Sequence, residues 1–143
     1  MIYFDTSALI KNFVLEEGSE LVQDLVGNST SVATASVAYA EVFSGLTRKR
    51  REGFLTISQH TAVCRQFEGH WLSYIHVELV QEILLLARDL IQRHPLRAFD
   101  AIHLASALSL QKGIGQVLQF AGADTRLLQA ATSENLIALN VES

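Results

Sequence analysis

The sequence predicts an α/β fold built on a mostly parallel central sheet of four or five strands. Short apolar runs rich in strand-forming residues alternate with longer segments of helical periodicity along the chain. The 143 residues include one proline and eight glycines, so no flexible linker divides them. Hydrophobic residues make up 49% of the chain and charged residues 18%, which favours a filled core over disorder. We therefore expect residues 1–143 to form one domain.

The first half of the chain opens with a strand and then alternates helices with a second strand. Ile2–Phe4 is a run of strand formers that ends at Asp5, and Thr6 or Ser7 is expected to cap the helix that follows. The expected elements are a strand at 2–4, a helix at 6–14, a helix at 17–26 ended by Gly27-Asn28, a strand at 31–34, a helix at 36–52 closed by Gly53, and a helix at 57–72.

The second half repeats this alternation. The expected elements are a short strand at 73–77, a helix at 78–92, a helix at 98–111 ended by Gly113, a strand at 116–120, a helix that Asp124 opens and that runs to about 131, and a strand at 136–139. The helix at 78–92 is expected to bury Val80, Ile83, Leu84, Ala87 and Ile91 on one face. The carboxyl ends of parallel strands are where sites form in such sheets.

Charge and cysteine content limit the classes of protein. Lys and Arg number 11 against 15 Asp and Glu, a net charge of −4, which is unusual for a nucleic-acid binder. A single cysteine, Cys64, excludes an internal disulfide and favours a reducing compartment. The first residues carry no basic segment of a signal peptide, and no apolar run reaches the roughly 18 residues of a membrane helix. We expect a cytoplasmic protein without a membrane contact.

Most charges have ordinary explanations. Asp89 and Arg93 stand four apart on a helix, the spacing of an exposed pair. Glu16, Glu17 and Glu20 are expected at a helix start, where the macrodipole favours acids.

Four other acids stand in apolar surroundings: Asp5, Glu41, Asp100 and Asp124. Asp5 ends the first strand, and Glu41 is expected in the middle of its helix, inside an apolar stripe. A buried carboxylate needs a proton, a cation or several donors, and basic partners are not obvious in the sequence. A divalent cation would serve several carboxylates at once, and oxygen ligands favour Mg²⁺ or Mn²⁺ over zinc.

Each acid also has a purely structural interpretation. Asp124 alone is explained as a helix N-cap, and Asp5 alone as the cap of the Thr6-Ser7 turn. Asp100, near a helix start, is favoured there by the macrodipole. Glu41 is the hardest to explain in this way, because a glutamate inside an apolar stripe is rare.

Four segments carry these acids in order along the chain: Tyr3-Phe4-Asp5-Thr6-Ser7-Ala8-Leu9, Ala40-Glu41-Val42, Arg97-Ala98-Phe99-Asp100-Ala101-Ile102-His103-Leu104-Ala105, and Phe120-Ala121-Gly122-Ala123-Asp124-Thr125-Arg126-Leu127. Together they resemble the PIN-domain nucleases, and most closely the VapC-type ribonuclease toxins among them. The resemblance covers nearly the whole chain and implies a three-layer α/β/α sandwich. One departure is Gly122, which stands where Ser or Thr is expected and removes a hydroxyl.

The resemblance implies a function and partners. Asp5, Glu41, Asp100 and Asp124 would hold one or two Mg²⁺ or Mn²⁺ ions and serve as the catalytic set of an endoribonuclease. Ser7 would support them. The protein would be the toxin of a type II toxin–antitoxin pair, with a small cognate antitoxin as partner and a homodimer as its assembly. The RNA target stays open.

Other residues carry weaker hypotheses. Arg48, Lys49, Arg50 and Arg51 form a basic run, and Arg126 follows Asp124 closely; all five are candidate RNA contacts, the run being equally explained as a solvated helix end. His103 is expected to be structural, with a proton carrier as the alternative. Tyr39, Phe43 and Trp71 are expected in the core.

Competing functions differ in what they require. A non-catalytic module of the same fold, binding RNA or a protein, would not need all four acids. A phosphatase of the aspartyl-phosphate type needs a second Asp where Ser7 stands, and a dinucleotide site needs a third glycine after Gly113-Ile114-Gly115. Without the four acids the charges are 11 against 11, so the acidity is concentrated in the expected metal site.

Overall fold

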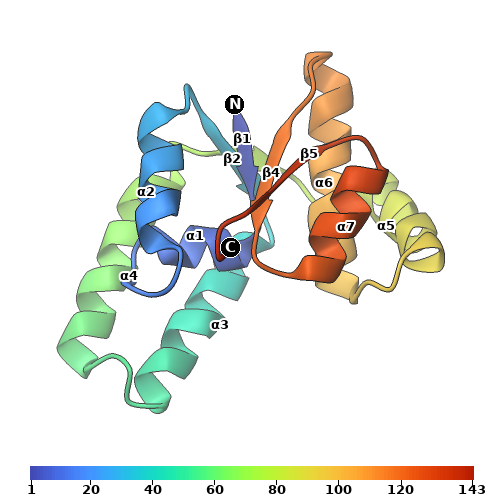
Figure 1. Ribbon diagram of the computed structural model, residues 1–143. Coiled ribbons are helices and arrows are strands. Elements are labelled where there is room, and N and C mark those ends of the chain that lie inside the picture. The colour runs from blue at the N-terminus through green and yellow to red at the C-terminus, as the bar shows by residue number, and fades with distance from the viewer.

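Five parallel strands form the centre of the molecule, and the computed structural model describes all residues from 1 to 143 (Figure 1). Their order across the sheet is β3-β2-β1-β4-β5, with every neighbouring pair parallel. The strands are β1 (Ile2–Phe4), β2 (Val32–Ala35), β3 (Ile75–Val77), β4 (Gln119–Gly122) and β5 (Ile137–Asn140). The predicted parallel sheet is confirmed, with the first strand at its centre.

Helices cover both faces of this sheet, which makes the expected three-layer sandwich (Figure 1). One face carries α1 (Thr6–Lys11), α2 (Ser19–Asn28), α3 (Ala38–Arg51) and α4 (Ile57–Trp71). The other carries α5 (Gln81–Arg93), α6 (Ala98–Ile114) and α7 (Thr125–Ser133). Each layer has its own apolar core against the sheet, one around Phe4 and Phe67 and the other around Tyr3 and Phe120. Alternate residues of β1 therefore serve opposite cores, as the twofold period of a strand requires.

Most helix boundaries differ from expectation by one to three residues, and α2 runs through the expected Gly27-Asn28 stop to Asn28. Two caps are also different residues from those expected. Asp5, not Thr6 or Ser7, is the N-cap of α1, with its Oδ1 accepting a hydrogen bond from the backbone N–H of Ala8. The helix α6 continues through Gly113 and ends at Gly115, whose φ of 68° is the left-handed conformation that glycine adopts freely.

The apolar face expected on α5 is partly wrong. Ile83 and Ala87 are buried as expected, together with Leu90. Val80, Leu84 and Ile91 are exposed instead. The expected Asp89–Arg93 pair is also wrong: Asp89 pairs with Arg88, and Arg93 pairs with Glu134 at the end of α7. The ion pair between Arg93 and Glu134 thus links the end of α5 to the end of α7, and both helices belong to the same layer.

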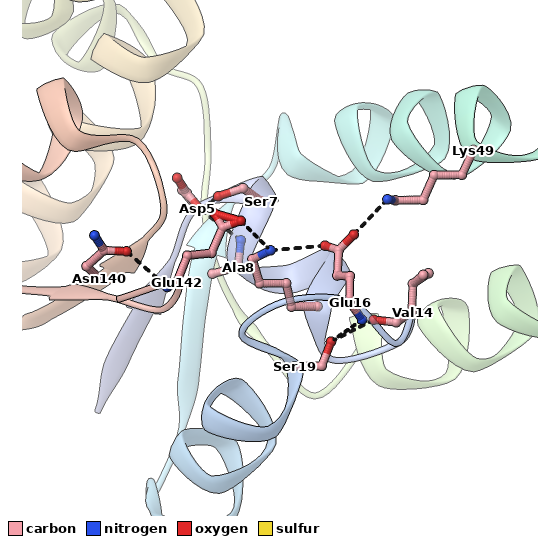
Figure 2. A network of polar contacts seen from close by, with 10 residues as sticks. Asp5, Ser7, Ala8, Val14, Glu16, Ser19, Lys49, Asn140 and Glu142 are labelled. Atoms are coloured by element: carbon pink, nitrogen blue, oxygen red, sulfur yellow. Dashed lines mark hydrogen bonds and ion pairs between the residues drawn. The ribbon is translucent and has the colours of Figure 1, made fainter. Parts of the chain in front are cut away.

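A network of charged side chains ties α1 to α3 and to the C-terminal residues. Lys11, almost fully buried, bonds Glu16 at 3.2 Å and Glu142 at 3.3 Å, and Glu16 also binds Lys49 at 2.7 Å. Glu16 thus lies before α2 and holds two lysines, instead of serving a helix start. Figure 2 shows the network beside Asp5 and Ser7. None of the helices combines the length and apolar character needed to cross a membrane.

Candidate active site

Asp5, Glu41, Asp100 and Asp124 line one cavity of about 760 Å³ at the carboxyl edge of the sheet. Asp5 directly follows β1 and Asp124 follows β4, its neighbour in the sheet. Glu41 and Asp100 lie in the first turns of α3 and α6. Four segments that are distant in the sequence thus deliver one carboxylate each to the same cavity.

Each of these acids lies at a helix N-terminus, and this position explains how the fold tolerates them together. Asp5 and Asp124 are the N-caps of α1 and α7, and each uses its Oδ1 to accept a backbone N–H. The positive end of a helix dipole favours a carboxylate. The structural interpretation of Asp5 and Asp124 as caps is therefore confirmed, and it holds together with their place in the cavity. Glu41 is not in the middle of its helix as expected, because α3 begins at Ala38.

Asp5 is the most buried of the set, with 5% of its surface exposed. Its Oδ1 accepts hydrogen bonds from the Ser7 hydroxyl at 2.7 Å and from the Ala8 amide at 2.9 Å, whereas Oδ2 has no protein donor. Burial raises the pKa of Asp5 and the charge of Asp100 raises it further, against the lowering effects of His103, Ala8 and Ser7. A cation in the cavity would relieve this desolvation and repulsion.

Gly122 lies against the second oxygen of Asp5. A Cβ atom at this position would stand 2.7 Å from Asp5 Oδ2. In this structure a side chain at position 122 would press on the carboxylate oxygen that the protein leaves free.

Glu41 is held by a buried chain of hydrogen bonds. Its Oε1 accepts from the Thr6 hydroxyl at 2.7 Å and bonds His103 Nε2 at 2.7 Å. His103 Nδ1 lies 2.7 Å from the Tyr3 hydroxyl. Burial opposes ionisation of Glu41, but the bonds from His103 and Thr6 outweigh it and lower its pKa. Glu41 is therefore a carboxylate at neutral pH, and the expected structural role of His103 includes contact with a site residue.

Arg97 is the residue that the sequence reasoning did not single out. Its guanidinium is 85% exposed and lies 3.5 Å from Asp100 Oδ2 and 3.8 Å from Asp124 Oδ2. The expectation that these acids lack basic partners is thus wrong for two of them. The Arg97–Asp100 spacing of three residues at a helix start is the signal that could have revealed it.

The five basic residues expected to contact RNA differ in their distance from the carboxylate cavity, as shown by the cavities that they line. Arg48 is exposed, lines the carboxylate cavity and pairs with no acid. Lys49 is bonded to Glu16 and lines an adjoining cavity. Arg126 lines a third cavity, which shares Arg97, Asp100 and Asp124 with the first. Arg50 and Arg51 line none of these three cavities.

The expectation that Tyr39, Phe43 and Trp71 belong to the core is confirmed in part, since all three are half-buried and pack against the core. All three pack around the fully buried ring of Phe67, with ring centroids 5.6–6.0 Å from it. These rings therefore stabilise the contact between α3 and α4.

The donors in the cavity suit a hard divalent cation. The oxygens are all carboxylate or hydroxyl, and Asp5 and Glu41 each keep one oxygen without a protein donor. No three acid or histidine side chains are gathered closely enough to ligate one ion together. Mg²⁺ retains several waters and often takes only one or two carboxylates directly, so the residues present fit it.

A family model and two sequence relatives both match this chain. The family model described as PIN domain matches residues 2–115. Two proteins of Mycobacterium tuberculosis strains, Ribonuclease VapC45 and Ribonuclease VapC49, are each 36% identical over 110 residues, which is 77% of this chain and 76% of theirs.

Solved structures share the fold at low sequence identity. A toxin-antitoxin complex from Klebsiella pneumoniae matches with a TM-score of 0.68 at 18% identity, covering 99% of this chain and 98% of the other. FitAcB from Neisseria gonorrhoeae matches with a TM-score of 0.68 at 16% identity over the same shares. With four acids at the edge of a parallel sheet and a family match over most of its length, the chain belongs to the PIN domain family, in its VapC-type group.

Proposed function

We propose that the protein is a metal-dependent endoribonuclease that cleaves RNA phosphodiester bonds at the carboxylate cavity. The observation that carries the proposal is the meeting of Asp5, Glu41, Asp100 and Asp124 in one cavity from four separate helix starts. Its relatives named as VapC ribonucleases support the reaction type. The same four residues are the proposed catalytic set.

The four carboxylates would hold one or two Mg²⁺ or Mn²⁺ ions. When bound, such an ion lowers the pKa of water and offsets negative charge on the phosphate. Asp5 would bind through its free Oδ2, since Oδ1 is engaged by Ser7 and Ala8. Ser7 has a supporting role, because its hydroxyl fixes the Asp5 carboxylate and it lines the same cavity.

Basic residues around the cavity would position the RNA backbone. Arg48 approaches from α3 without an ion-pair partner, and Arg97 approaches from the start of α6. Arg126 extends the positive rim beyond Asp124. Lys49, Arg50 and Arg51 would add to the field that attracts phosphate, with Lys49 weakened by its bond to Glu16.

The biological role proposed is that of a toxin in a type II toxin–antitoxin pair, with a small cognate antitoxin as partner. The VapC names of its relatives support this role, and structures with the same fold include a toxin-antitoxin complex. We also propose that the protein forms a homodimer. We propose a cytoplasmic location for it, because its RNA substrate is found there. The PIN domain is proposed to span residues 1–143, because β4, α7 and β5 complete the sheet and carry Asp124.

The test is cleavage of a labelled single-stranded RNA by the purified protein with Mg²⁺ or Mn²⁺. Asp5→Asn and Asp100→Asn should each lower the cleavage rate by about 100-fold or more, and a chelator should abolish cleavage. Asparagine caps a helix as well as aspartate does, so Asp5→Asn should keep α1 folded. Asp89→Asn is the matched control, because Asp89 is exposed on α5 and pairs only with Arg88. Full activity in Asp100→Asn would overturn the assignment of the site.

A non-catalytic PIN-fold module that binds RNA or a protein is the alternative. It predicts a folded protein that binds RNA or Mn²⁺ without any turnover, under conditions in which a known ribonuclease cleaves the same substrate. The retention of all four acids in the cavity argues against this alternative, since binding alone would not require them.

A further inference from the structure

A buried polar chain connects the central strand to the carboxylate cavity. It runs from the Tyr3 hydroxyl on β1 to His103 on α6 and then to Glu41 on α3, with 2.7 Å at each step. Tyr3 is fully buried and His103 is 2% exposed. The chain joins three elements whose residues are distant in the sequence, and it ends on one of the proposed site acids.

Both ring nitrogens of His103 have a hydrogen-bond partner in this chain. An ionised Glu41 only accepts hydrogen bonds, so His103 Nε2 carries the hydrogen that it donates to Oε1. The other ring nitrogen, Nδ1, lies 2.7 Å from the Tyr3 hydroxyl, within hydrogen-bond distance. Every buried side-chain polar atom has a partner. Tyr3 thus holds one nitrogen of the His103 ring while the other faces Glu41.

These hydrogen bonds make the two carboxylate oxygens of Glu41 different from each other. Oε1 is engaged twice, by His103 and by Thr6, whereas Oε2 has no protein donor. A glutamate side chain has several rotatable bonds, and holding one orientation costs conformational entropy unless other groups fix it. His103 and Thr6 fix it from two sides and leave one oxygen available to the cavity that Glu41 lines.

We propose that His103, oriented by Tyr3, is a positioning residue that sets the direction of the Glu41 carboxylate. The proposal rests on the proposed function, because it assigns Glu41 a role in binding a divalent ion. His103 acts through Glu41, because its Nε2 is already hydrogen-bonded to Glu41 Oε1. The His103 ring also has almost no exposed surface, so a substrate cannot reach it to exchange a proton. The Tyr3 ring is held in turn by stacking on Phe120, at 5.3 Å between centroids.

The experiment measures Mn²⁺ affinity by calorimetry, together with RNA cleavage, for variants along the chain. His103→Leu keeps an apolar side chain of similar reach but loses the donor, and should weaken Mn²⁺ binding by about 10- to 100-fold. His103→Gln places an amide donor near the position of Nε2 and should restore much of that affinity. Tyr3→Phe removes one hydroxyl from a packed ring and should weaken Mn²⁺ binding by a smaller factor, with thermal unfolding still cooperative.

A double-mutant cycle separates positioning from a general structural effect. If His103 acts through Glu41, adding His103→Leu to Glu41→Gln should cause little further loss of Mn²⁺ affinity. Additive losses, or wild-type Mn²⁺ affinity in folded Tyr3→Phe and His103→Leu, would overturn the positioning role while wild-type cleavage still supports the proposed function. A wild-type protein that neither binds Mn²⁺ nor cleaves RNA would overturn both.

Discussion

Replacing Gly122 by alanine would place a methyl group against the carboxylate of Asp5. The new Cβ would stand 2.7 Å from Oδ2 and 3.1 Å from Cγ, and ordinary contact begins near 3.4 Å, about 0.7 Å further from Oδ2. The backbone has little freedom to move, because Gly122 pairs with Asn140 in the sheet and its carbonyl accepts from the Val141 amide. The carboxylate of Asp5 must therefore turn.

Turning Asp5 disrupts the two hydrogen bonds that hold Oδ1 and weakens the cap of α1. Loss of an N-cap costs about 0.5–2 kcal/mol, and the reduced freedom of alanine in the unfolded chain offsets about 0.4–1 kcal/mol. The net loss of stability is then about 0.5 kcal/mol, too little to unfold the protein. Displacement of a site carboxylate by this distance is expected to lower kcat/KM by about 10- to 100-fold.

The assay for Gly122→Ala is RNA cleavage with Mn²⁺, read together with unfolding in urea. Gly27→Ala is the matched control: its Cβ would meet no heavy atom within 4 Å on α2, so it should raise helix stability by about 0.5–1 kcal/mol and leave cleavage unchanged. If Gly122→Ala folds and retains wild-type kcat/KM, the free oxygen of Asp5 is not required and the reasoning fails.

Three further predictions concern charge. Glu134→Gln should lower the free energy of unfolding by about 0.5 kcal/mol near neutral pH. Burial opposes ionisation of Glu134, but bonds from His94 and Arg93 outweigh it and lower its pKa from the ordinary 4.5. Its contribution is thus complete above that value and lost as the pH falls through the lowered pKa; urea titrations showing the same deficit at pH 3 and pH 7 would contradict this. Lys11→Met should lower the free energy of unfolding by about 1–2 kcal/mol, because Glu142 loses its ion-pair partner and Glu16 keeps only Lys49; unchanged urea stability would show the network to be neutral. In an Asp100→Asn background that prevents turnover, Arg48→Gln should reduce the slope of log affinity for single-stranded RNA against log salt by about 0.7, whereas Arg88→Gln on α5 should leave it unchanged; equal slopes for the two variants would remove Arg48 from the RNA path.

Local patterns in the sequence predict most of the fold. All five strands fall within a few residues of their expected places, because each is a short run of strand formers with a turn or helix signal beside it. The face of α5 is the main error. Ile91 and Leu90 are both apolar, and only the packing of α5 against α6 decides that Leu90 turns inward. Such a choice depends on tertiary contacts that periodicity does not contain.

The candidate site was predictable in its acids and in the support of Ser7, but not in the supports that act over a long range. Asp5, Glu41, Asp100 and Asp124 stand out because each is a carboxylate among apolar residues, and the structure brings them to one cavity. The supports come from far along the chain: Tyr3 and His103 are 100 residues apart, and Arg97 reaches Asp124 only when β4 and α6 are in place. Contacts of this range follow from the assembled sheet and leave no local pattern.

The most direct test of the site is anomalous diffraction from a crystal of the wild-type protein grown with MnCl₂. The account predicts an anomalous peak inside the cavity that Asp5, Glu41, Asp100 and Asp124 line. A cavity without a peak at saturating Mn²⁺, or a peak only at a distant surface site, would contradict the claim that these four acids form a metal centre.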